Sequence, residues 1–147
     1  MDAMAPITRP AVQLLPAACL TYNRTHMDRT FLLVGALAGF IGVAFGAFGA
    51  HALRGRLSPD MLAVFETGVR YQMYHAFAVL IVAIATARFD GWLARAAGWS
   101  FTLGIVLFSG SLYALALTGA TRLGMITPLG GLAFLVGWAL LIVLAIV

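Results

Sequence analysis

The sequence predicts an all-α membrane protein in which four transmembrane helices form a bundle. Of its 147 residues 63% are apolar and only 10% are charged, whereas a soluble domain carries about 25% charged residues. The mean hydropathy is +1.00. An apolar helix of about 20 residues crosses the hydrocarbon core of a bilayer. Four apolar segments reach that length, at approximately residues 31–53, 69–88, 96–118 and 126–147.

The first span carries glycines at alternating steps of four and three residues. Steps that average 3.5 residues place all of them on one helix face. In lipid, helices associate through small residues that let two backbones approach closely. The sequence therefore predicts that another helix packs along this face, through Gly35, Gly39, Gly42, Gly46 and Gly49.

Ser58 and Pro59 indicate a helix start between the first and second spans. Serine caps the free amides of a first helical turn, proline suits the first helical position, and Asp60 favours the positive end of the helix dipole. The apolar residues that follow lie on one side of this helix. We expect a short interfacial helix that lies in the headgroup region and turns into the membrane at Gly68. One continuous helix is the alternative.

Small and hydroxylated residues also recur in the last two spans, where they predict close helix packing. The third span places two hydroxyls and a glycine at mid-membrane. The fourth begins with Thr127 and Pro128, a second cap and first-position pair. The residues expected to pack the helices here are Ser109, Gly110, Ser111, Gly130, Gly131 and Gly137.

Four motifs follow one another in order along the chain. They are Gly46 to His51; Phe65 to Gly68 with Tyr71, Gln72 and His75; Leu107 to Tyr113; and Thr127-Pro128 with Gly130, Gly131, Gly137 and Trp138. Together they resemble the YgdD-like family of small four-helix membrane proteins, which is catalogued as a domain of unknown function. The resemblance covers residues 27–147. It implies a four-helix protein of the bacterial inner membrane and brings no established activity.

Residues 1–26 differ in composition from the rest of the chain. They include Pro6, Pro10 and Pro16, so no helix of useful length is predicted there. Met27 resembles a natural start for the first span. We expect residues 1–26 to be a disordered leader or an overlong gene prediction, and residues 27–147 to be the transmembrane domain.

The candidate polar site lies where the loop joins the first two spans, so we expect its members near one membrane face. They are His51, Glu66, Arg70, Gln72 and His75. Glu66 and Arg70 are spaced for an (i, i+4) ion pair. Ionisable groups within a span are costly and are therefore functional candidates. In the structural hypothesis, the two histidines bond to Glu66, Ser109 or Ser111 and fasten the helices together.

Two functional hypotheses use the same residues. Histidines that titrate near neutrality, with a carboxylate, could form a proton or small-ligand site. His51 and His75 could instead be the axial ligands of a haem. Two histidines lack the further ligands that zinc needs, and the sequence predicts no metal or cofactor.

Several function classes are disfavoured by composition. The nine basic residues are all arginines and form no run, so no nucleic-acid partner is predicted. The spans contain no cysteine and few carboxylates, and periodicity brings no serine, histidine and acid together, so no enzyme is predicted. The sequence favours a structural or interaction protein, or an accessory subunit. Its expected partners are the lipid bilayer and further copies of itself or other membrane proteins.

The charge distribution does not decide the orientation. Arg24, Arg29, Arg88 and Arg95 lie on the side of the termini, and Arg54, Arg56, Arg70 and Arg122 lie on the other. We expect a multi-pass protein of the bacterial inner membrane with both termini in the cytoplasm.

Overall fold

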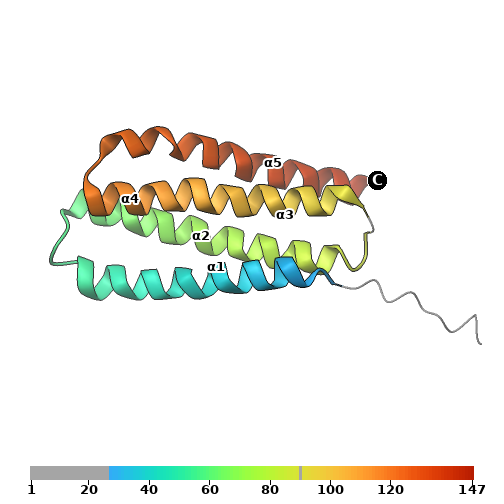
Figure 1. The fold of residues 1–147 in the computed structure, drawn as a ribbon, viewed down its shortest axis with the longest axis horizontal. Coiled ribbons are helices and arrows are strands. Elements are labelled where there is room, and N and C mark those ends of the chain that lie inside the picture. The colour runs from blue at the N-terminus through green and yellow to red at the C-terminus, as the bar shows by residue number, and fades with distance from the viewer. Residues whose placement is uncertain (1–26, 90) are drawn as a thin grey trace, which may run out of the picture.

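The computed structural model describes residues 27–89 and 91–147, which form four long antiparallel helical rods (Figure 1). Each rod is long and apolar enough to cross a membrane, which confirms the all-α class with four spans. The leader expected at residues 1–26 lies outside the described residues. In chain order the elements are α1 (Arg29–Phe48) with the π-helical segment η2 (Gly49–Leu53); α2 (Pro59–Ala85); α3 (Trp92–Gly104), the π-helical segment η3 (Ile105–Ser109) and α4 (Gly110–Thr118); and the 3-10 turn η4 (Thr121–Met125) with α5 (Thr127–Ile146).

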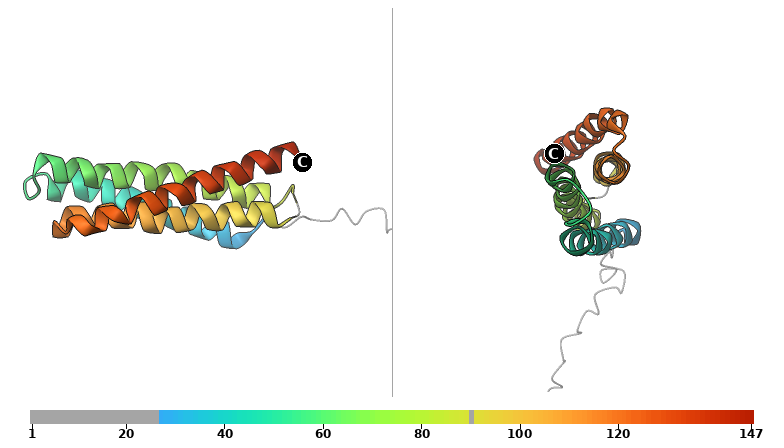
Figure 2. Two further views of the ribbon diagram at one scale, coloured as in Figure 1. Left: turned by 90° about the horizontal axis from the view of Figure 1, so that it is seen from above. Right: turned by 90° about the vertical axis from the view of Figure 1, so that its left-hand side faces the viewer.

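Two rods lie in the middle of the bundle and two lie outside them (Figure 2). The central rods are α2 and the third span, formed by α3, η3 and α4; α1 packs on α2, and α5 packs on the third span. The start of α1 and the end of α5 lie at one end of the bundle, which we call the terminal end (Figure 1). The opposite end, which holds residues 54–58 and 119–126, is the loop end.

The glycines of α1 let this helix approach α2 closely. A β-carbon added to Gly42 would lie 2.6 Å from the sulfur of Met73, and one added to Gly35 would lie 2.8 Å from the side chain of Leu80. A larger residue at either position would require the side chain of Met73 or of Leu80 to shift. The glycines of α1 and η2 that contact α2 are Gly35, Gly42, Gly46 and Gly49.

Gly39 does not share this contact, because a β-carbon there would meet no atom within 4 Å. At about 100° per residue, Gly39 lies roughly 40° to one side of Gly35, and Gly42 lies roughly 20° to the other side. The tight contact lies on the Gly42 side of the stripe, so the edge that carries Gly39 stays open. Gly110 has the same open surroundings, and Gly131 makes only an ordinary contact at 3.9 Å.

Glycines also set the distance between α5 and the third span. A β-carbon on Gly130 would collide with the backbone of Phe108. One on Gly137 would lie 2.6 Å from the ring of Phe101, which is completely buried. The two rods therefore touch backbone to backbone near Gly130 and ring to backbone near Gly137.

The second span is one continuous helix, so the expected separate interfacial helix is wrong and its alternative is correct. The helix begins where the sequence predicts, with Pro59 in the first turn and the hydroxyl of Ser58 accepting the Met61 N–H at 3.3 Å. Gly68 is no hinge. A β-carbon there would lie 2.8 Å from the ring of Tyr113, so glycine is needed for that contact.

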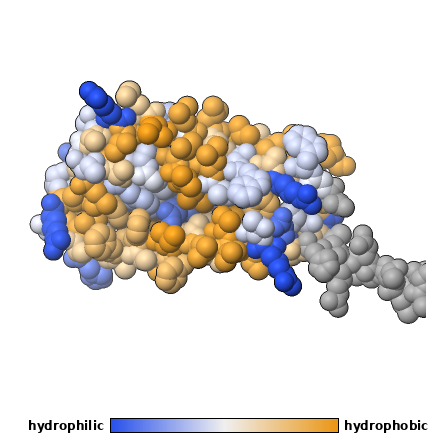
Figure 3. All heavy atoms as spheres, in the orientation of Figure 1, coloured by the Kyte–Doolittle hydropathy of each residue, from blue (hydrophilic) through white to orange (hydrophobic). Residues whose placement is uncertain are grey.

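The outer surface of the bundle suits lipid. Figure 3 shows apolar side chains over the middle of one face and strongly hydrophilic ones mainly toward its two ends. Large apolar side chains are widely exposed, among them Phe40 at 74% and Leu135 at 67%. Exposure of this extent fits contact with the acyl chains of a bilayer.

Candidate functional site

The five candidate polar residues do not form one cluster. Gln72 and His75 are buried, at 4% and 6% exposure, whereas His51, Glu66 and Arg70 are exposed. Two residues of helix turn about 200°, so the face that carries Arg70 is nearly opposite the face that carries Gln72. The expectation of a single patch near one membrane face is therefore wrong.

Gln72 joins three helices through its side-chain amide. Its nitrogen donates to the carbonyl oxygen of Ala38 on α1 at 2.8 Å, and its oxygen accepts the hydroxyl of Tyr113 on α4 at 2.9 Å. Both ends of the amide are thus satisfied inside the bundle. In a poorly hydrated site an unmade hydrogen bond is costly, so this arrangement holds α1, α2 and α4 in one register.

Tyr113 is a member of this network that the site prediction missed. The centroid of its ring lies 4.8 Å from the ring centroid of Phe45 and 4.9 Å from that of Phe65, and the ring packs over Gly68. The aromatic contacts fix the ring, and the ring places its hydroxyl on Gln72. Position alone could have drawn attention to it, since a tyrosine within a span needs a partner for its hydroxyl.

His75 uses both ring nitrogens within the protein. Nδ1 lies 2.8 Å from the carbonyl oxygen of Tyr71, and Nε2 lies 3.4 Å from the indole nitrogen of Trp138 on α5. An indole N–H can only donate, so Nε2 accepts and the proton sits on Nδ1. The imidazole also stacks on Phe134, with ring centroids 3.4 Å apart and planes 4° apart. His75 therefore links α2 to α5 as a neutral imidazole.

The two histidines lie at different depths. Gly49, two residues before His51, packs against Phe65, and Phe65 lies ten residues before His75 on α2. Ten helical residues span about 15 Å. One haem iron cannot receive both imidazoles across that distance, so the haem hypothesis is wrong for this fold. The hydrogen bonds expected from the histidines to Glu66, Ser109 or Ser111 are wrong as well, because His75 bonds to Tyr71 and Trp138 instead.

The two serines of the third span differ from one another. The hydroxyl of Ser111 donates to the carbonyl oxygen of Phe108 at 2.9 Å and lies 2.8 Å from the hydroxyl of Thr127, so it joins α4 to α5. The buried hydroxyl of Ser109 has no partner within the described part of the chain. It ends the π-helical segment η3, where Gly110 donates to a carbonyl five residues back, at Ile105.

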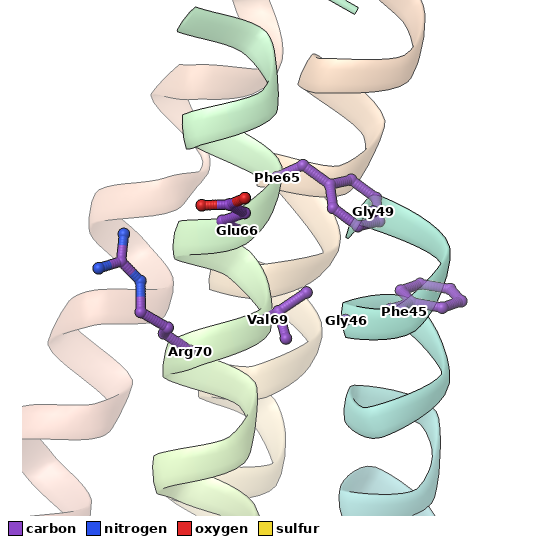
Figure 4. A pocket seen from close by; sticks show the side chains of 7 residues that line it. All are labelled: Phe45, Gly46, Gly49, Phe65, Glu66, Val69 and Arg70. Atoms are coloured by element: carbon purple, nitrogen blue, oxygen red, sulfur yellow. The ribbon is translucent and has the colours of Figure 1, made fainter. Parts of the chain in front are cut away.

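Glu66 and Arg70 share the outward face of α2 and lie beside a cavity. The guanidinium of Arg70 donates to the hydroxyl of Thr67 at 3.3 Å. No ion pair within 4 Å joins Arg70 to Glu66 or to another acid of residues 27–89 and 91–147, so the predicted (i, i+4) pair is not closed. The cavity measures about 280 Å³ and lies between α1 and α2 (Figure 4); its lining is Phe45, Gly46, Gly49, Phe65, Glu66, Val69 and Arg70.

Metal ligands do not gather in the described ranges, where no three His, Cys, Asp or Glu side chains come together. Three of the four buried polar side chains of the described residues, Gln72, His75 and Ser111, instead connect helices. Four apolar spans whose internal hydrogen bonds join one span to another define a small integral membrane protein.

The chain belongs to the family described as protein of unknown function DUF423, whose model matches residues 45–131. This confirms the resemblance seen in the sequence. The chain is similar to the UPF0382 membrane protein YwdK of Bacillus subtilis, with 44% identity over 119 residues that cover 80% of this chain and 97% of the relative.

Two further relatives come from other bacteria. The UPF0382 inner membrane protein YgdD of Escherichia coli is 43% identical over 125 residues, which cover 81% of this chain and 91% of the relative. A UPF0382 membrane protein of Haemophilus influenzae is 47% identical over 112 residues, which cover 76% and 90%. No solved structure matches the chain.

Proposed function

We propose that this chain acts as a structural or interaction component of the membrane and not as an enzyme. The observation that carries the proposal is that both ends of the Gln72 amide are hydrogen-bonded to other helices, at Ala38 and at Tyr113. A binding or catalytic site keeps polar groups free for its ligand. Here the buried side chains of Gln72 and His75 form hydrogen bonds within the bundle itself.

The other interhelical bonds support the same proposal. Trp138 donates to His75 across α5 and α2, and Ser111 meets Thr127 across α4 and α5. At the terminal end the backbone N–H of Asp28 donates to the hydroxyl of Thr86. Each bond ties two spans at a different depth, as a protein needs when its role is to present a fixed outer surface.

Replacing His75 by leucine tests the proposal against a proton or ligand site. If His75 fastens α2 to α5, the variant leaves the Trp138 N–H without an acceptor and should lose about 1–2 kcal/mol of stability. If His75 is kept for a ligand, removing a buried polar group should leave the bundle as stable or more so. Thermal melting in one detergent measures the difference.

His51→Leu is the matched control, since His51 is exposed near the loop end and its side chain makes no hydrogen bond to the described residues. We expect its melting temperature to equal that of the unchanged protein. A His75→Leu variant that melts with or above the control would contradict the structural role.

For location and partners, we propose the bacterial inner membrane, with both termini cytoplasmic and with self-association or other membrane proteins as partners. The printed name of the Escherichia coli relative includes the inner membrane. Both ends of the described chain lie at the terminal end, so they share one side. The exposed apolar faces of α1 and α5 offer the contact area.

Cysteine labelling tests the orientation. The native Cys19 is the only cysteine, so it is first replaced by serine. Cysteines at Arg56 and Asp60, both exposed at the loop end, should then react with an impermeant reagent in whole cells. Reaction only after lysis would reverse the orientation. A cysteine at Arg29, exposed at the terminal end, is the opposite-side control.

A further inference from the structure

The cavity between the first span and α2 exists because the first span has no side chains at its floor. Gly46 and Gly49 leave the space, and the rings of Phe45 and Phe65 with Val69 form its apolar walls. A β-carbon on Gly49 would lie 3.1 Å from the ring of Phe65, so a larger residue would narrow the cavity. Its volume of about 280 Å³ exceeds the share of a few waters.

The cavity lies at the depth of lipid headgroups. The apolar run of the first span covers residues 31–50, and Gly46 and Gly49 lie within its last five residues toward the loop end. Twenty helical residues match the hydrocarbon thickness, so the end of this run marks the boundary with the headgroup region. A lipid in the loop-end leaflet therefore brings its phosphate to this level, with its acyl chains along the exposed surface below.

Glu66 and Arg70 line one edge of this cavity, and Figure 4 shows the guanidinium of Arg70 pointing away from Gly46 and Gly49. Helical side chains lean toward the N-terminal end of their helix, which for α2 is the loop end. The guanidinium of Arg70 accordingly extends toward the level of Glu66, held by its bond to Thr67 (Figure 4). The carboxylate and the guanidinium form no ion pair with each other within 4 Å. Each is available to a ligand.

This pair complements a ligand with one negative and one positive group. A guanidinium matches a phosphate with two parallel N–H donors. A carboxylate can only accept, so it favours an ammonium that carries N–H donors. A quaternary ammonium has no such donors, and a headgroup with phosphate alone meets the carboxylate as a like charge.

We propose that the edge of this cavity, where α2 presents Glu66 and Arg70, binds the headgroup of a zwitterionic phospholipid with a primary amine, with its phosphate on Arg70 and its ammonium on Glu66. The chemistry is that of phosphatidylethanolamine. The site is independent of the Gln72 network, which lies on the other face of α2, so either proposal can fail without the other.

The test measures lipid retained by the full chain. The protein is reconstituted into nanodiscs with equal parts of phosphatidylethanolamine, phosphatidylcholine and phosphatidylglycerol, released into detergent, and weighed with bound lipid by native mass spectrometry. We expect phosphatidylethanolamine to be retained about fivefold or more over each of the others, a preference of roughly 1 kcal/mol. Equal retention of the three lipids overturns the proposal.

Charge-neutral variants assign the contacts. Arg70→Gln should reduce retention of phosphatidylethanolamine and of phosphatidylglycerol alike. Glu66→Gln should remove the preference for the amine and raise retention of phosphatidylglycerol. Both side chains are exposed, so melting temperatures should not change. The control is Arg54→Gln, another exposed arginine at the loop end, which should retain lipid as the unchanged protein does.

Two outcomes overturn the assignment in different ways. If Arg54→Gln lowers retention as much as Arg70→Gln, the lipid follows the general charge of the loop end and not this cavity. If the Glu66 and Arg70 variants change the oligomeric mass while lipid retention stays constant, the two charges face a second copy of the chain.

Discussion

Replacing Gly130 by alanine should destabilise the bundle by about 3 kcal/mol. The new β-carbon would collide with the backbone nitrogen of Phe108 and lie 2.7 Å from its α-carbon. A flexible side chain could rotate away, but the backbone of the third span cannot move without opening its packing with α5. Relief requires the two rods to separate, and this exposes the contacts of Phe134 and Gly137 as well.

The neighbouring Gly131→Ala variant is the matched control. A β-carbon there would lie 3.9 Å from the ring of Phe108, which is ordinary contact. Alanine is a better helix former than glycine by about 1 kcal/mol, so this variant should be neutral or slightly more stable. Both are measured by thermal melting in the same detergent. Equal melting temperatures for the two variants would show that α5 does not approach Phe108 as described.

The spans were predictable because their evidence is local. Runs of apolar residues of bilayer length, and the Ser58-Pro59 start of α2, each act through neighbouring residues only. The role of Gly68 was not predictable in this way. A glycine ten residues after the Ser58 cap suggests a bend, and only the position of Tyr113, 45 residues away, shows that it makes room for a ring. The π-helical turn before Gly110 likewise has no sequence pattern nearby that would predict it.

The candidate site was predictable as a set of residues and not as an arrangement. Helical spacing predicts that Glu66 and Arg70 share one face of the helix and that Gln72 and His75 share another. In the structure the first two residues are exposed and the last two are buried. The four residues do not form one patch, because Arg70 and Gln72 lie about half a helical turn apart and therefore on opposite faces. Which face turns inward depends on partners from distant helices, such as Tyr113, and these are invisible to helical periodicity.

The second large effect is expected at Gln72, where Gln72→Leu should cost about 2 kcal/mol. Leucine fills a similar volume but offers no acceptor to the hydroxyl of Tyr113, which is only 8% exposed. An orphaned buried polar group costs about 1–3 kcal/mol. The bond to Ala38 on α1 is lost in the same step. If Gln72 were instead held for a ligand, the variant should melt no lower than the unchanged protein.

A double-mutant cycle with Tyr113→Phe separates the bond from the packing. Tyr113→Phe alone should destabilise the bundle by about 1 kcal/mol, because the Gln72 oxygen then lacks its donor. In the double variant both partners are apolar and neither is orphaned, so it should be no less stable than Gln72→Leu alone. Tyr74→Phe, at a residue 60% exposed, is the silent control. If the two single effects simply add, Gln72 and Tyr113 are not bonded, and the proposal that internal polar groups fasten this membrane bundle loses its main support.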